Sequence, residues 1–381
     1  MSDDYRICVR CVMDTSDPEI EFDDAGVCSH CATFDRQARS EWHPGEDGRR
    51  LLEPIVAAIK SKGRGREYDC VIGLSGGIDS SYLALIARKE LNLRLLAVHV
   101  DSGWNSELAV GNIERICRRL GIDLHTHVLN WEEVRDLQLA FLTAGVANLD
   151  VPQDHAFTAA LYREAANHGI RTLLSGGNVA TESVLPRAWG YIAMDRRHLR
   201  AIHREYGARP LTTFPTLSFF EYYFYLPGIA RIRSVRPLNY VPYQREAAIE
   251  RLRREVDFRP YETKHGESRF TKFFQNYYLP QRFGFDKRRA HFASLILSGQ
   301  MKRENALEQL AEPLYTETEL REDRRFFVKK LGLSDARLDE LMAQPLRDHR
   351  AFASNEHLFN AKDRIKRVLT GTLRRVRNER G

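Results

Sequence analysis

Short apolar runs alternate with segments of helical periodicity along residues 68–175 of the chain. The apolar runs are bounded by polar residues or glycines and predict buried β-strands at residues 68–74, 94–100, 123–129 and 170–175. Between them, apolar residues three or four positions apart predict helices at residues 79–91, 107–120, 131–144 and 154–168. This alternation predicts an α/β fold with a doubly wound, Rossmann-like parallel sheet, in which ligands lie at the carboxyl ends of the strands.

The rest of the chain departs from this pattern. A helix is predicted at residues 49–62, behind a polar linker, whereas residues 191–257 mix aromatic residues with prolines. Farther along, short helices are predicted at residues 287–299, 302–312, 317–331 and 334–344. We therefore predict three parts, which are a small N-terminal module, an ATP-binding α/β domain and a mainly helical region, at residues 1–45, 46–265 and 266–381.

Four of the six cysteines are spaced like the ligands of a metal ion. They form two C-x2-C pairs, which are Cys8 with Cys11 and Cys28 with Cys31. Each pair can occupy two corners of a tetrahedron, so we predict a structural Zn²⁺ site that stabilises a module too small to fold alone. His30 is interpreted as a neighbour of this site. Cys70 and Cys117 lie in a predicted strand and helix, as core residues.

A glycine-rich segment, Ser75-Gly76-Gly77-Ile78-Asp79-Ser80, connects the first predicted strand to the helix after it. Glycines let the backbone approach a ligand closely, and the amides at a helix start attract anions. The SGGxDS pattern resembles the pyrophosphate loop (PP-loop) of the ATP pyrophosphatases, which cut ATP between the α- and β-phosphates. It lacks the Gly-Lys ending of a Walker loop, so cleavage at the γ-phosphate is not implied. An ordinary glycine-rich turn is the alternative.

The ends of two other predicted strands carry candidate ligand contacts. Asp101 and Ser102 follow the second strand, where their side chains can hydrogen-bond a ribose or an adenine. For Asp101, a role in the turn itself is an equal alternative. Gly176 and Gly177 follow the fourth strand and predict a second glycine turn beside the nucleotide or the substrate.

Ionisable residues also gather beside a glycine at residues 264–272. Such a mixture is costly to bury and is poorly suited to packing alone. Lys264 is interpreted as a cation for the α-phosphate. Glu267 is interpreted as an acid/base, a substrate anchor or a metal carboxylate. The alternative is a surface loop ahead of a capped helix.

Composition narrows the class of protein. The chain has 381 residues, of which 43% are hydrophobic and 29% charged, as in a globular protein with a substantial core. It has no apolar run of about 18 residues, which excludes a membrane span, and its polar start predicts a cytoplasmic protein. The net charge of +6 fits a polyanionic ligand such as ATP or a nucleotide sugar, and equally fits RNA.

Several of these stretches together resemble the N-acetyl sugar amidotransferases of bacterial surface-polysaccharide synthesis. The similarity includes both cysteine pairs, the loop at residues 74–80 and residues 264–272, and it extends from residue 5 to about residue 310. In that family an acetamido group on a sugar becomes an acetamidino group. The resemblance implies a nucleotide-sugar substrate for lipopolysaccharide O-antigen or a related glycan. It also implies ammonia from a separate glutaminase, with a barrel-type channelling subunit.

The loop suits that chemistry, because an amide oxygen leaves readily only after it has been adenylated. We therefore expect ATP and Mg²⁺ as cofactors beside the structural Zn²⁺. Asp79 would hold Mg²⁺ or cap its helix, and it forms the expected catalytic set with Lys264 and Glu267. The phosphates are expected to lie on Ser75, Gly76, Gly77 and Ser80.

Two other classes of protein stay open. A tRNA-modifying PP-loop enzyme of the thiolase or lysidine type shares the loop, but no C-x2-C pair follows residue 31 to carry sulfur. A zinc-ribbon binding protein that no longer cleaves ATP conflicts with the intact loop. A free-standing amidating enzyme of the NAD- or GMP-synthetase type is a lesser variant, and nucleic acid is the less favoured partner.

Overall fold

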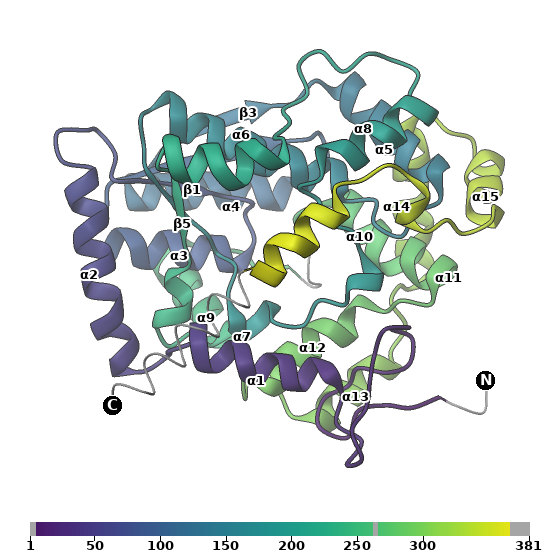
Figure 1. Cartoon of the computed structure of the whole chain (residues 1–381), viewed down its shortest axis with the longest axis horizontal. Helices are drawn as coiled ribbons and strands as arrows, with labels where there is room; N and C mark the ends of the chain where they lie inside the picture. The colour runs from purple at the N-terminus through teal and green to yellow at the C-terminus, as the bar shows by residue number, and fades with distance from the viewer. Residues whose placement is uncertain (1–4, 262–265, 366–381) are drawn as a thin grey trace.

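A five-stranded parallel sheet forms the centre of the protein, in a computed structural model that describes residues 5–261 and 266–365. The strand order is β3-β2-β1-β4-β5, and each neighbouring pair is parallel. Figure 1 shows β1, β3 and β5 among the surrounding helices. The predicted doubly wound α/β fold is therefore confirmed. The strands are β1 (Cys70–Gly73), β2 (Leu95–Asp101), β3 (Asp123–Val128), β4 (Thr172–Leu174) and β5 (Arg233–Val235).

The two faces of the sheet pack into two separate hydrophobic clusters, because successive side chains of a strand point to opposite faces. Within β1, Val71 joins one cluster, whereas Cys70 and Ile72 join the other. The first cluster is covered by α6 (Val151–Asn167). The second is covered by α3 (Ile78–Lys89), α4 (Glu107–Leu120) and α9 (Arg245–Val256). Helices on both faces are what a parallel sheet requires.

The remaining helices surround this sheet. The predicted helices at residues 49–62, 131–144, 287–299, 302–312, 317–331 and 334–344 are all present, with ends that shift by a few residues. The short segments include π-helices at Glu221–Ile229 and Phe274–Tyr278, and 3-10 turns at Arg187–Trp189, Pro237–Tyr240 and His349–Ala351. The other helices are α1 (Ser29–Glu41), α2 (Glu46–Lys62), α5 (Trp131–Ala144), α7 (Val179–Glu182), α8 (Arg196–Tyr206), α10 (Arg269–Phe273), α11 (Leu279–Phe283), α12 (Lys287–Leu297), α13 (Arg303–Ala311), α14 (Glu317–Leu331) and α15 (Asp335–Ala343).

Within residues 191–257, the sequence pattern missed α8, β5 and α9, besides the π-helix and the 3-10 turn. Strand β5 has only three residues and begins with the exposed pair Arg233 and Ser234, so it shows no apolar run. Helices α8 and α9 are dominated by arginines and other polar residues and bury only a narrow apolar stripe. Their place in the fold depends on the surfaces they cover, which the local sequence does not show.

Hydrogen bonds and an ion pair join the N-terminal cysteine module to the C-terminal helices. Arg303 donates hydrogen bonds to the backbone oxygens of Cys8 and Cys11, at 2.9 and 2.8 Å for the shortest contacts. Arg289 of α12 pairs with the buried Asp14 at 2.9 Å. Residues from all three predicted parts contribute to one hydrophobic cluster, and the division into three parts stays a prediction. Among the described residues, no helix combines the length and apolar character that crossing a bilayer requires.

Candidate active site and metal centre

The glycine loop turns sharply from β1 into α3. Gly76 has φ = +79°, and a Cβ there would lie 2.7 Å from the backbone oxygen of Ala109, so this position needs glycine. Ser75 braces the turn, because its Oγ accepts a hydrogen bond from the Gly77 amide at 3.2 Å and lies 3.3 Å from Ser80 Oγ. The first turn of α3 is thereby presented at the carboxyl end of β1, where helix amides favour an anion.

The second glycine turn lies against the first. A Cβ on Gly176 would lie 3.2 Å from the Ser80 amide nitrogen, and the Gly177 amide donates to Ser175 Oγ at 3.2 Å. β1 and β4 are neighbours, and the chain leaves β1 through α3 on one face of the sheet but reaches β4 through α6 on the other, so the two turns meet where the strand order reverses. Ligands of open parallel sheets bind at this position. The structure thus brings together loops that are about 100 residues apart in the sequence.

A cavity of about 1040 Å³ opens at this end of the sheet. Its lining includes Ser75 and Ser102 from the strand ends and Glu267, Ser268 and Thr271 from the segment around α10. The charged side chains that line it within the described residues are Glu41, Asp150, Asp154, Arg236 and Glu267. Carboxylates therefore outnumber cations in this lining, which suits a divalent cation bound together with a polyphosphate.

Asp101 and Ser102, the predicted ligand contacts at the end of β2, have different roles in the structure. Asp101 Oδ1 accepts hydrogen bonds from the Gly103 amide at 2.7 Å and from Asn105 Nδ2 at 2.9 Å, so this carboxylate stabilises its own turn. Ser102 lines the cavity and donates to Gln153 Oε1 at 2.8 Å. Glu267 Oε1 lies 3.4 Å from the position of a Cβ on Gly77. Lys264 lies outside the described residues.

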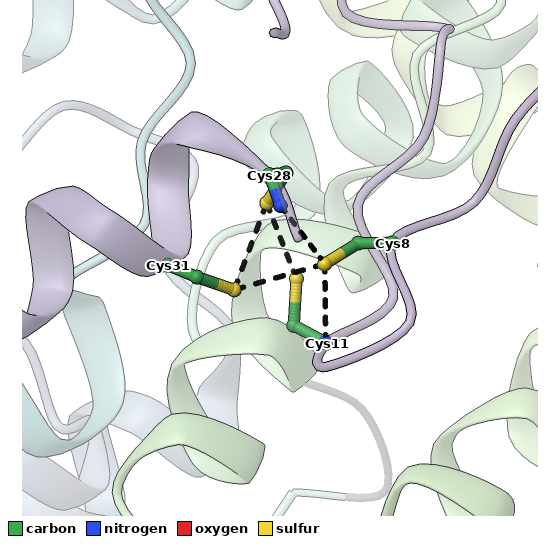
Figure 2. Close-up of side chains that lie close together, drawn as sticks. All are labelled: Cys8, Cys11, Cys28 and Cys31. Atoms are coloured by element: carbon green, nitrogen blue, oxygen red, sulfur yellow. Dashed lines mark hydrogen bonds between the residues drawn. The ribbon is translucent and has the colours of Figure 1, made fainter. Parts of the chain in front are cut away.

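The four paired cysteines converge on one point, as Figure 2 shows. Cys8 and Cys31 lie 3.7 Å apart between sulfurs, Cys11 and Cys28 lie 3.6 Å apart, and Cys28 and Cys31 lie 3.7 Å apart. A tetrahedral Zn²⁺ ion with Zn–S bonds of about 2.3 Å requires sulfur separations of about 3.8 Å. All four are buried and free of disulfides, so this donor set fits a closed, structural metal site.

Backbone amides support the sulfurs of this cluster. The amides of Cys11 and Cys28 donate to Cys8 Sγ at 3.4 and 3.3 Å, and the Met13 amide donates to Cys11 Sγ at 3.4 Å. Such donors stabilise thiolates, the form that binds metal. His30 faces away, because its Nε2 lies 2.7 Å from Asp17 Oδ2.

The other two cysteines lie in the core, as predicted. Cys70 is fully buried in β1 and Cys117 is buried on α4. Burial raises the pKa of both thiols, and that of Cys117 reaches about 11. A thiol that stays protonated at neutral pH is a poor nucleophile, so neither residue is suited to glutamine hydrolysis.

Two protein families match separate stretches of the chain, and both stretches contribute residues to the cavity. The asparagine synthase family matches residues 66–216, which carry the glycine loops. The family described as LPS biosynthesis protein WbpG-like, C-terminal domain, matches residues 267–367, which begin at Glu267. The two matches together support a protein of the N-acetyl sugar amidotransferase type.

Curated relatives share only a short segment with the chain. The tRNA(Ile)-lysidine synthase of Nitratidesulfovibrio vulgaris is 42% identical over 74 residues, which are 18% of this chain and 21% of the relative. The glutamine-hydrolysing GMP synthase of Aeropyrum pernix is 33% identical over 82 residues, 22% of this chain and 15% of the relative. The chain therefore spans less than a quarter of these two relatives. Among solved structures, the U34-tRNA thiolase NcsA of Methanococcus maripaludis with its 4Fe-4S cluster is 15% identical, covers 81% of this chain and 89% of that one, and has a TM-score of 0.34.

Two tyrosines that the sequence did not indicate contact the glycine loop. Tyr243 donates its hydroxyl proton to Asp79 Oδ1, and Tyr261 donates to the Gly76 backbone oxygen at 2.9 Å. Burial, followed by the Asp79 charge, raises the pKa of Tyr243 well above its usual range, so the phenol stays a donor. The tyrosines come from segments more than 160 residues away, which is why the local pattern gave no sign of them.

Asp150 is a further residue of the cavity that the sequence did not indicate. Its Oδ1 accepts hydrogen bonds from Gln153 Nε2 at 3.0 Å and from Thr271 Oγ1 at 3.1 Å. Burial, and then the charge of Asp154, raises the pKa of this carboxyl to about 8. Pro152, in the first turn of α6, is a helix-start signal that would have placed Asp150 before the helix. Nothing in the sequence placed Thr271 beside it.

Asp150→Asn should change how stability depends on pH. Between about pH 4 and pH 8 the folded protein holds a proton on Asp150 that the unfolded chain has lost, so this group makes stability fall as pH rises through that window. Asparagine does not titrate. The difference in melting temperature, variant minus wild type, should therefore become more positive from pH 5 to pH 9. Differential scanning calorimetry at constant ionic strength measures both proteins.

Asp154→Asn provides the matched control. Removing the neighbouring charge should lower the pKa of Asp150 and move the window to lower pH without abolishing it. Melting temperatures of wild type and Asp150→Asn that run parallel across the whole range would show that Asp150 keeps an ordinary pKa.

Proposed function

We propose that this protein adenylates the acetamido group of a nucleotide-linked N-acetyl sugar and then replaces the carbonyl oxygen with ammonia. One observation carries the proposal. A single cavity is lined both by Ser75 and Ser175, the first residues of the two glycine turns within the asparagine synthase match, and by Glu267, Ser268 and Thr271 of the WbpG-like match. ATP cleavage and sugar chemistry would thus share one site. The acetamidino product would serve lipopolysaccharide O-antigen or a related surface glycan.

The chemistry divides into two balanced steps. The amide oxygen attacks the α-phosphorus of ATP, which forms an O-adenylyl imidate, releases pyrophosphate and frees the amide proton. Ammonia then adds to the imidate carbon, and AMP leaves with the former carbonyl oxygen. The protein's task in both steps is to position the reactants and stabilise charge.

The residues of the loops are proposed to hold the nucleotide. Ser75, Gly76, Gly77 and Ser80 would bind the phosphates, with Gly176 and Gly177 closing the other side of the site. Asp79 would bind Mg²⁺, which neutralises the pyrophosphate as it leaves. Ser102 would contact the ribose or adenine, whereas Asp101 would support it by holding their shared turn. The role of Lys264 at the α-phosphate stays a prediction.

Two carboxyl groups of the cavity are proposed to act on the sugar and the ammonia. Glu267 would anchor the sugar or exchange a proton with it. Asp150 keeps its proton up to about pH 8, so its carboxyl would act as a hydrogen-bond donor beside the reacting group. Because Cys70 and Cys117 are buried, the ammonia is proposed to come from a separate glutaminase with a barrel-type channelling subunit. The cysteine cluster would hold Zn²⁺ in a structural role.

Mass spectrometry tests this proposal directly. The protein is incubated with ATP, Mg²⁺, ammonium labelled with heavy nitrogen, and a panel of UDP-linked diacetamido sugars. A product in which one oxygen is exchanged for a labelled NH group, with equal amounts of AMP and pyrophosphate, is expected. AMP and pyrophosphate formation without any labelled sugar would contradict the proposed substrate.

A tRNA-modifying function is the second candidate, and the similarity to tRNA(Ile)-lysidine synthase favours it. The same reaction mixture with bulk tRNA in place of the sugars distinguishes the two. Cleavage of ATP that depends on tRNA and not on a nucleotide sugar would replace the first proposal with the second.

A further inference from the structure

A cluster of histidines and one glutamate lies at the edge of the sheet, apart from the two sites described above. His125 and His127 stand on β3, the edge strand, and the i, i+2 spacing places them on the same face of it. Glu164 comes from the last turns of α6, and His168 follows at the end of that helix. The strand is largely exposed, so packing does not explain the two histidines.

The ligand atoms of this cluster converge on one point. His125 Nε2 and His127 Nδ1 lie 3.7 and 3.9 Å from Glu164 Oε1. All three atoms lie within 4.8 Å of one another. His168 Nε2 lies 4.0 Å from the other oxygen, Glu164 Oε2. A tetrahedral site with bonds of about 2.1 Å needs ligand atoms about 3.4 Å apart, and the distances of both histidine nitrogens from Glu164 Oε1 are within a few tenths of an ångström of that value.

The carboxylate of Glu164 is directed at the three histidines. Its side chain is 10% exposed, yet none of the hydrogen bonds found within the described residues ends on it. A buried carboxylate is costly unless it is hydrogen-bonded or bound to a cation. The three histidine contacts are all longer than a hydrogen bond, which leaves room for an ion between them.

We propose that His125, His127 and Glu164 form a second metal site for a divalent transition ion, with Zn²⁺ as the natural choice and His168 as a fourth ligand. Two imidazoles and one carboxylate suit Zn²⁺ and exclude a preference for Mg²⁺ or Ca²⁺, which favour oxygen ligands. The ion would tie the exposed edge strand β3 to α6, the helix whose other end lines the cavity. It would also protect the open edge of the sheet.

Zinc binding to the intact protein tests this site. The chain is purified with its cysteine cluster filled, and added Zn²⁺ is titrated in equilibrium dialysis against a weak chelator, with bound metal and melting temperature as the readouts. Wild type should bind one ion beyond the cysteine site and melt at a higher temperature with it. Glu164→Gln and His127→Asn should each weaken this second binding by at least about tenfold.

His357→Asn is the matched control, because His357 is an exposed histidine outside the cluster and its loss should leave the second ion bound. Melting in the presence of the chelator shows whether each variant folds. Wild type that binds no ion beyond the cysteine site would overturn the proposal. Glu164→Gln that binds like wild type would also overturn it, since the metal would then be held by surface imidazoles alone.

Discussion

Asp79→Asn should lower the rate of AMP and pyrophosphate formation by about 10²- to 10³-fold, the loss typical of removing one group that stabilises charge in a transition state. The substitution keeps the size of the side chain and its ability to accept a hydrogen bond from Tyr243, but removes the negative charge proposed to bind Mg²⁺. A partial recovery at high Mg²⁺ concentration is expected. Release of pyrophosphate, followed at several Mg²⁺ concentrations, measures both effects.

Tyr243→Phe distinguishes the two roles open to Asp79. This variant keeps the buried ring and removes only the hydroxyl that donates to Asp79. If Asp79 serves only to hold Tyr243, Tyr243→Phe should lose at least as much activity as Asp79→Asn, and added Mg²⁺ should rescue neither variant. If Asp79 binds Mg²⁺, Tyr243→Phe should lose far less activity than Asp79→Asn. Wild-type turnover in Asp79→Asn would refute its assignment to the site.

Cys28→Ser should release the metal ion of the N-terminal cluster and open the module. The free energy of binding a structural Zn²⁺ ion is about 10–16 kcal/mol in small zinc-binding peptides, and it is available only while all the ligands are in place. Opening would also deprive Arg303 of the two carbonyls it contacts and would expose Asp14. Zinc content by elemental analysis should fall by one ion per chain, together with a lower melting temperature.

Loss of the ion should also lower the activity, because α1 starts directly after Cys28 and ends at Ser40 and Glu41 in the cavity wall. Cys117→Ser is the matched control, since it replaces a buried thiol remote from the cluster and should leave zinc content unchanged. Equal zinc content in Cys28→Ser and wild type would contradict the metal assignment.

The sequence predicted those elements correctly in which the local pattern of apolar residues matches the burial of the element. In β1 and β2 both faces are buried, so these strands read as continuous apolar runs. The glycine loop was equally visible, because Gly76 adopts a conformation that other residues rarely adopt. By contrast, β5 and α8 carry little apolar signal of their own, and their structure depends on neighbours that are distant in the chain.

By itself, the sequence determined the alternating α/β pattern, the glycine loop and the four convergent cysteines, because each rests on spacing over a few residues. Only the tertiary structure decided that Asp101 serves its own turn, that Tyr243 donates to Asp79, and that Asp150 lies buried against Thr271. Those contacts join segments about 120 to 160 residues apart, or depend on how one side chain competes for nearby amides. Burial and charge at such positions arise from the packing of whole elements, which no local pattern encodes.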